Sequence, residues 1–180
     1  MLDKKKIEEA RTNVRRYLDS GQLSQEKPQE IVSKTLVVNS RESLETADFL
    51  AKNHKSGLWI IVCSYYSMFY MANAVLYKLG YKVGDHTPHK VTSDALIVYV
   101  KDKLRGSLLE DYEEIKEEAL LLAQNKAEGL IENFDKEREK RSRIQYKTEE
   151  IEKNVRANTS LQRAKEFIKE MEKLLVDLNK

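Results

Sequence analysis

The residues best suited to chemistry form a basic segment in the C-terminal third of the chain. Between residues 136 and 147, six basic side chains and two acidic ones give a local charge of +4: Lys136, Arg138, Lys140, Arg141, Arg143 and Lys147, with Glu137 and Glu139. Guanidinium groups bind phosphate through paired hydrogen bonds, and a helix that begins here would add its N-terminal N–H groups. The segment therefore predicts a phosphate contact; the alternative is a solvated, salt-bridged helix end.

The histidines give a weaker signal. His86 and His89 flank Thr87 and Pro88, and the only other histidine is His54. A zinc site normally needs three or four ligands, so we expect no metal site and no cofactor. His89 is expected to cap a helix turn, to sit half-exposed or to contact an anion. The acidic runs at 110–114 and 117–118 lack a Glu-x-x-His partner and are expected to form the wet face of an amphipathic helix.

One apolar stretch must position these groups. From Leu58 to Leu79 the chain runs for 22 residues in which only Ser64, Ser67, Asn73 and Lys78 are neither apolar nor aromatic. A helix that is hydrophobic nearly all round is buried in a bundle or lies in a bilayer. Tyrosines in mid-span favour the bundle, because membrane helices keep tyrosine at the interfaces. We therefore expect a central buried helix, with Cys63 as a small buried hydrophobe.

Three-four spacing of apolar residues predicts the remaining helices. They cover about 3–19, about 29–55 as one bent helix or two, from Pro88 to about 104, from about 107 to near Asp135, and from near Thr148 to the C-terminus. Thr87 and Pro88 are predicted to cap and open the fourth of these, and Gly80 to end the central helix. The seam of the last helix, from Leu161 to Leu178, is expected to face the core, and no strand pattern is apparent.

The composition of the chain limits the class of protein to which it can belong. The chain has 180 residues, six glycines, two prolines, one cysteine and a net charge of +2. These values predict one compact all-α domain, an up-and-down bundle of about five to six helices, with an N-terminal helix and connection at 1–28 and the bundle at 29–180. The net charge implies no general attraction to nucleic acid, and the single cysteine fits a cytoplasmic location.

Several motifs, taken in order, resemble the HEPN domain family. Ser64-Tyr65-Tyr66-Ser67-Met68-Phe69-Tyr70, running on to Leu79-Gly80, is similar to the family's Tyr-Tyr-x-x-Phe helix that ends in Leu-Gly. His89 resembles the family's histidine at the next turn, and Arg141 to Tyr146 its late Arg-x-x-Tyr segment. The resemblance covers about residues 29–178. It implies a helical bundle that forms a homodimer.

The resemblance also bears on activity. Active members of the family are similar to metal-independent ribonucleases with an arginine and, four to six residues later, a histidine. Here Tyr146 stands at that spacing from Arg141, and a tyrosine with a pKa near 10 is a poor general base at neutral pH. We therefore expect no catalytic residues.

The resemblance then implies a module that binds nucleotide or RNA phosphates at Arg141, Arg143, Tyr146 and His89, within a toxin–antitoxin or nucleotidyltransferase system. One alternative is a protein-partner or dimerisation module without a ligand. A second is a metal-independent ribonuclease in which His89 replaces the absent histidine.

Overall fold

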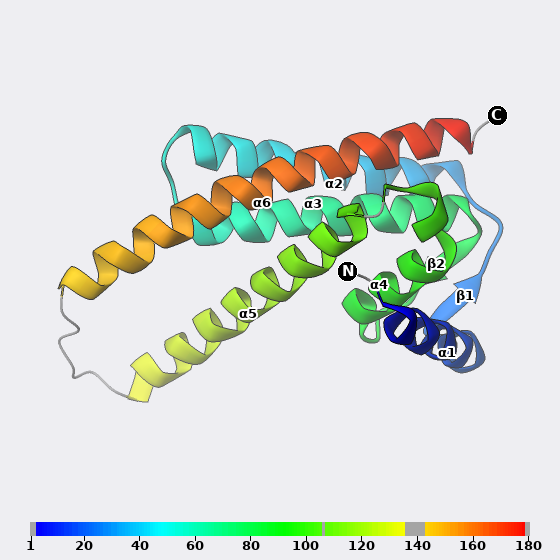
Figure 1. The fold of residues 1–180 in the computed structure, drawn as a ribbon, viewed down its shortest axis with the longest axis horizontal. Helices are drawn as coiled ribbons and strands as arrows, with labels where there is room; N and C mark the ends of the chain where they lie inside the picture. Colours follow the sequence, from blue (N-terminus) through cyan, green and yellow to red (C-terminus); the bar gives the residue numbers. More distant parts are fainter. Residues whose placement is uncertain (1–2, 106, 136–142, 179–180) are drawn as a thin grey trace.

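The computed structural model describes residues 3–105, 107–135 and 143–178, with side chains in 3–105, 107–124 and 155–178. In these ranges the chain forms helices α1 Lys4–Ser20, α2 Glu30–Lys52, α3 Gly57–Lys78, α4 Pro88–Tyr99, α5 Ser107–Asp135 and α6 Arg143–Asp177. Two short strands, β1 Leu23–Gln25 and β2 Tyr81–Val83, and a 3-10 turn at Lys101–Lys103 complete the described elements. The predicted all-α bundle is confirmed (Figure 1).

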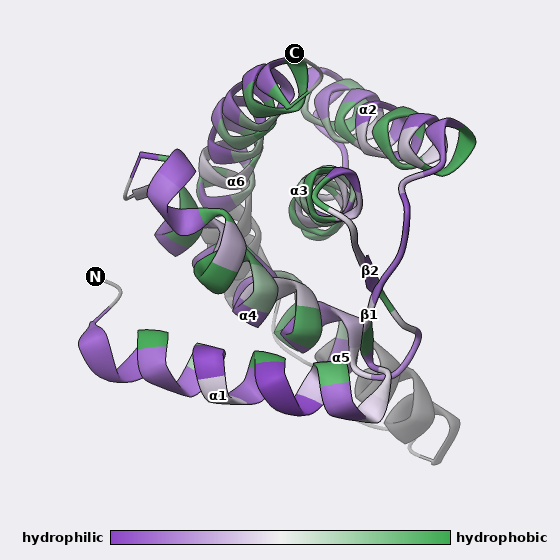
Figure 2. Cartoon of the chain, turned by 90° about the vertical axis from the view of Figure 1, so that its right-hand side faces the viewer, coloured by the Kyte–Doolittle hydropathy of each residue, from purple (hydrophilic) through white to green (hydrophobic). Residues whose placement is uncertain are grey.

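Helix α3 is the centre of the bundle, as its apolar sequence predicts. It contacts α2, α4, α5 and α6, and most of its side chains are buried. Figure 2 looks along α3, with α2 and α6 above it and α4 and α5 below. The buried side chains of all six helices join one core, which includes Tyr17 of α1, Tyr112 of α5 and Phe167 of α6. Helix α1 thus packs into the same core as the rest of the chain.

Most predicted helix boundaries agree with the structure. Gly21 follows α1 with φ 75°, and Gly80 follows α3 with φ 90°, a conformation that glycine adopts without steric cost. The segment at about 29–55, predicted as one bent helix or two, forms a single helix, α2. The fourth predicted helix is shorter than expected, because α4 ends at Tyr99 and the 3-10 turn follows.

Two predictions about secondary structure were wrong. The last helix begins at Arg143, five residues before the predicted start at Thr148. The strands β1 and β2 were missed because each has only three residues, too few to show an alternating pattern. They pair antiparallel, with Leu23 opposite Val83, and tie the end of α1 to the end of α3.

Two side-chain predictions had different outcomes. The seam of α6 is core as expected, since Leu161, Ala164, Ile168 and Met171 are buried. Cys63, expected to be buried, is half-buried. It packs against the edge of the core.

Helix α3 alone among the described helices is long and apolar enough to cross a membrane, judged by length and composition. Of its apolar window, 61% is buried inside the bundle. This degree of burial is compatible with the core helix of a soluble protein.

Truncating the core of α3 is expected to be costly. Leu76 is fully buried, so Leu76→Ala should leave a cavity and lower the free energy of unfolding by about 2–5 kcal/mol. The matched control is Leu121→Ala, because the Leu121 side chain is 57% exposed and its loss should change stability by less than about 0.5 kcal/mol. Urea denaturation measures both. Similar losses in the two variants would contradict the placement of Leu76 in the core.

Candidate phosphate-binding site

His89 lies in an aromatic slot on α3. It is the second residue of α4, and its ring centroid lies 4.7 Å from that of Phe69, 5.5 Å from that of Tyr65 and 5.9 Å from that of Tyr66. The structure therefore brings together two of the motifs that the sequence analysis singled out, the Tyr-Tyr-x-x-Phe stretch and the following histidine. The imidazole is half-buried there.

The turn before His89 holds an unusual backbone conformation. Thr87 has φ 49° and ψ 45°, in the left-handed region that β-branched residues rarely adopt. Thr87 stands at the predicted cap position, but its side chain makes no capping hydrogen bond; its hydroxyl accepts one from Gln22 Nε2 at 3.1 Å. This contact joins the turn to the segment between α1 and β1.

The Tyr65 hydroxyl orients the His89 ring. The two groups are hydrogen-bonded, with Tyr65 Oη 2.7 Å from His89 Nδ1. Burial raises the pKa of Tyr65, so the phenol stays protonated and can donate to Nδ1. Burial also lowers the pKa of His89, with a smaller contribution from the positive charge of Lys116. Both effects favour the neutral imidazole, and when Nδ1 accepts from Tyr65 the proton of the neutral ring is on Nε2.

A network of charged side chains lies beside this slot. Lys116 of α5 donates to Ser93 Oγ at 2.8 Å and to both carboxylate oxygens of Glu113 at 3.0 Å. Glu113 also pairs with Lys6 of α1 at 3.1 Å. The Lys116 and Glu113 side chains are only 13% and 12% exposed. The network joins α1, α4 and α5, with the single carboxylate of Glu113 shared between two lysines.

A second polar cluster fixes α1 on α4. Asp94 Oδ2 accepts hydrogen bonds from Asn13 Nδ2 at 3.1 Å and from the Tyr17 hydroxyl at 2.9 Å. Burial raises the pKa of Asp94, while the two hydrogen bonds oppose that effect. Burial and the Asp94 carboxylate together raise the pKa of Tyr17 to about 12. These groups hold the N-terminal helix in place.

Sequence reasoning missed both clusters. Glu113 was expected on the wet face of its helix, but it is 12% exposed, whereas Glu114 and Glu117 in the same helix are exposed as predicted. The spacing of Glu113 and Lys116 gives a local pair, but their burial depends on α1, which is distant in sequence. Among the described residues, no three His, Cys, Asp or Glu side chains form a group that could hold a metal ion.

The remaining predicted site residues are not placed at the level of side chains. Arg141 lies outside the described residues, and the side chains of Arg143 and Tyr146, on the first turns of α6, do too. Lys116, beside His89, precedes the end of α5 at Asp135 by 19 residues, about 28 Å of helix. The C-terminal part of α5 therefore lies between the neighbourhood of His89 and the start of the basic segment.

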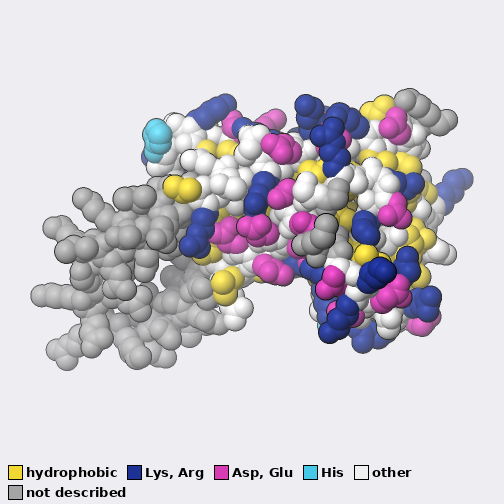
Figure 3. Space-filling view, viewed as in Figure 1, with side chains coloured by type: hydrophobic (Ala, Val, Ile, Leu, Met, Phe, Trp, Pro, Cys, Tyr) yellow, Lys and Arg dark blue, Asp and Glu magenta, His cyan; other side chains and the backbone are white. Residues whose placement is uncertain are grey.

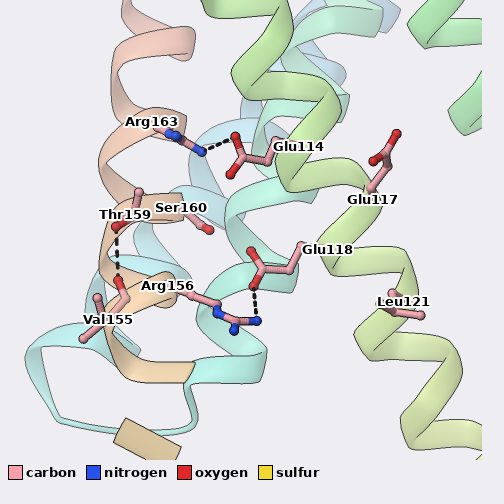
Figure 4. Close-up of a pocket in the computed structure, with 9 residues that line it drawn as sticks. All are labelled: Glu114, Glu117, Glu118, Leu121, Val155, Arg156, Thr159, Ser160 and Arg163. Atoms are coloured by element: carbon pink, nitrogen blue, oxygen red, sulfur yellow. Dashed lines mark hydrogen bonds and ion pairs between the residues drawn. The ribbon is translucent and has the colours of Figure 1, made fainter. Parts of the chain in front are cut away.

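The pocket between α5 and α6 carries both signs of charge (Figure 4). It has a volume of 470 Å³ and lies between Glu114, Glu117 and Glu118 on α5 and Arg156 and Arg163 on α6. Arg163 Nη1 lies 2.8 Å from Glu114 Oε2, and Arg156 Nη1 lies 4.0 Å from Glu118 Oε1. Figure 3 likewise shows acidic and basic side chains interspersed along this face of the described chain. The pocket therefore does not favour an anion.

A second pocket, of 550 Å³, lies between the start of α2 and the ends of α3 and α6. Its cations are Lys34, Arg41 and Lys78. Lys34 pairs with Glu30 at 2.7 Å and Arg41 with Glu172 at 2.8 Å, so carboxylates neutralise much of this charge. The pocket is a weaker candidate for phosphate than the segment at 136–147.

No protein-family model matches the chain, and comparisons with curated proteins and with solved structures found no match. The resemblance to HEPN domains therefore stays a prediction.

Removing the charge of Glu113 is expected to loosen the network that joins three helices. Glu113→Gln leaves Lys116, which is 13% exposed, without its carboxylate and should lower the free energy of unfolding by about 1–3 kcal/mol. Glu117→Gln, an exposed position on the same helix, is the control and should change stability little. Urea denaturation measures both variants. If the free energy of unfolding is unchanged in Glu113→Gln, the network contributes nothing to stability.

His89 should make the fold sensitive to mild acid. Because its pKa is lowered in the folded chain, the unfolded chain binds a proton first as the pH falls through the unfolded value of about 6.5. The contribution of His89 to the free energy of unfolding is therefore retained above about pH 6.5 and lost as the pH falls below it.

We expect the urea midpoint to fall between about pH 7.5 and pH 5.5. His89→Gln, which keeps an acceptor for Tyr65, should make this fall smaller, and the exposed His86→Gln serves as control. An equal fall in wild type and His89→Gln would contradict the argument.

Proposed function

We propose that this chain is a non-catalytic, HEPN-like module that binds the phosphates of a nucleotide or of RNA. In this proposal Arg141 and Arg143 supply the phosphate contacts, and Tyr146 stacks or hydrogen-bonds beside them. His89 offers a further contact at a separate place, because about 28 Å of α5 follow its neighbour Lys116. The module acts as a homodimer in the cytoplasm, and its system is of the toxin–antitoxin or nucleotidyltransferase type.

The observation that carries the proposal is where α6 begins. The described part of α6 starts at Arg143, with Tyr146 and Lys147 close behind, and Arg141 comes two residues before it in the sequence. The first turn contains no acidic residue. Basic side chains oppose the positive end of the helix dipole, so this start is unfavourable by itself. A bound phosphate would satisfy both the cations and the first N–H groups of the helix.

The alternative, a protein-partner module without a ligand, has lost the main observation that supported it. It was suggested by the apolar seam of α6, which would be an association surface if it faced outward. The seam faces the core, with Ala164 and Met171 fully buried. A partner protein would therefore have to use another surface of the chain.

The residual ribonuclease is the weaker reading for a geometric reason. In that mechanism His89 would have to act next to Arg141. Helix α5, however, passes His89 at Lys116 and continues to Asp135 before the chain reaches the basic segment. Tyr146 stands where active members of the family have a histidine, and no histidine follows His89. Cleavage of RNA in chelator that disappears in His89→Ala would revive this reading.

Phosphate binding is tested with Arg141→Ala. Equilibrium binding of single-stranded RNA and of adenine nucleotides, without metal and at two salt concentrations, should be weaker in the variant. For RNA, loss of one phosphate contact should reduce the slope of log K against log salt by about 0.7. Arg15→Ala on α1, which removes an exposed arginine far from the segment, is the matched control and should bind like wild type. Equal binding by wild type and Arg141→Ala would overturn the proposal, and absence of binding to either ligand would favour the protein-partner alternative.

A further inference from the structure

A pocket of 340 Å³ lies beside the C-terminal half of α3, and aromatic rings form much of its wall. Phe69, Tyr70 and Tyr77 come from α3, and Tyr81 comes from β2. Helix α2 and strand β2 flank this part of α3 (Figure 2). Ligand sites in proteins have volumes of roughly 300–1,000 Å³ and walls that are mostly apolar. The pocket is therefore of a size that takes a small molecule.

The rings are held in place by their neighbours. The centroids of Phe69 and Tyr70 lie 5.8 Å apart, with the ring planes inclined at 60°. Tyr81 stacks on Tyr99, with centroids 3.9 Å apart and an angle of 16° between the planes, so one face of the Tyr81 ring is covered. Tyr77 is only 3% exposed, and its hydroxyl accepts a hydrogen bond at 3.3 Å from the backbone N–H that precedes α2. Because these rings are already ordered, a ligand binds against them at a small cost in conformational entropy.

The charged groups at the pocket leave one carboxylate in excess. Lys82 lines the pocket, but its Nζ lies 3.2 Å from Glu26 Oε1, so the charge of Lys82 is compensated. Asp85 also lines the pocket, and no hydrogen bond or ion pair joins its side chain to another described residue. The wall therefore combines aromatic rings with one uncompensated negative charge.

This combination selects the charge of a ligand. The face of an aromatic ring carries partial negative charge and attracts cations. An ammonium ion with methyl or other apolar groups on its nitrogen suits such a wall, because those groups pack on the rings. An anion would be repelled by Asp85, and a neutral apolar molecule would gain nothing from that carboxylate. We infer that this pocket binds a small organic ammonium ion with apolar substituents on nitrogen, held against the aromatic rings with Asp85 as its counter-charge.

The inference goes beyond the proposed function and does not rest on it. The described lining of the pocket comes from α2, α3 and the segment from Tyr81 to Pro88, whereas the proposed phosphate contacts are Arg141 and Arg143. The two sites take ligands of opposite charge. Failure of either binding experiment therefore leaves the other proposal standing.

Choline and 3,3-dimethylbutan-1-ol test the preference for a cation, because they have the same shape but differ in a charged nitrogen or a neutral carbon. Isothermal titration calorimetry of the full chain should give a millimolar or tighter Kd for choline and binding at least about 10-fold weaker for the alcohol. In amide NMR spectra, choline should shift the signals of residues 69–77 and 81–85, which locates the site without any variant.

Two variants separate the contributions of ring and carboxylate. Tyr70→Leu keeps an apolar side chain but removes a ring, so it should weaken choline binding by about 10-fold and leave binding of the alcohol nearly unchanged. Phe49→Leu, at an aromatic residue that is 62% exposed on α2, is its matched control. Asp85→Asn should weaken choline binding by about 3–10-fold. Glu117→Gln, which removes an exposed carboxylate on α5, should bind choline as wild type does.

Asp85 also comes two residues before Thr87, the N-cap of α4, where a carboxylate stabilises the positive end of the helix. If Asp85→Asn lowers the urea midpoint but leaves choline binding unchanged, the carboxylate serves the helix alone and the inference is overturned. Equal binding of choline and the alcohol would overturn it too. The same holds if Tyr70→Leu binds choline as wild type does, if choline shifts only signals outside the pocket, or if choline does not bind at up to about 50 mM.

Discussion

The rest of the structure depends on enclosing a helix, α3, that carries no charge before its last residue, Lys78. Between Gly57 and Tyr77 the chain has no ionisable side chain other than cysteine and tyrosine. Burying such a helix removes a large apolar area from water, roughly 25 cal/mol for each Å². The amphipathic helices of the chain serve this purpose: α2, α4, α5 and α6 each place an apolar face on α3. Helix α1 adds a second layer over α4.

Three polar contacts of α3 decide how its neighbours sit, because buried polar groups are usually hydrogen-bonded. The carbonyl of Ser67 accepts a hydrogen bond from the Ser40 hydroxyl at 2.7 Å, which brings α2 close. Tyr65 meets His89 and Asn73 meets Thr92 at 3.3 Å, and both contacts position α4. Packing alone would allow α2 and α4 to slide along an apolar surface. These hydrogen bonds fix their register, and so they fix the turn that carries His89.

The sequence determined the helices well and their contacts poorly, for a physical reason. Helical spacing and glycine are local signals, so the ends of α1 and α3 at Gly21 and Gly80 could be predicted. Contacts between distant segments leave no such signal. The β1–β2 pair, the burial of Glu113 beside Lys6 and the left-handed conformation of Thr87 all depend on partners far along the chain. The start of α6 was misjudged because Glu149 and Glu150 suit a first turn better than Arg143 does.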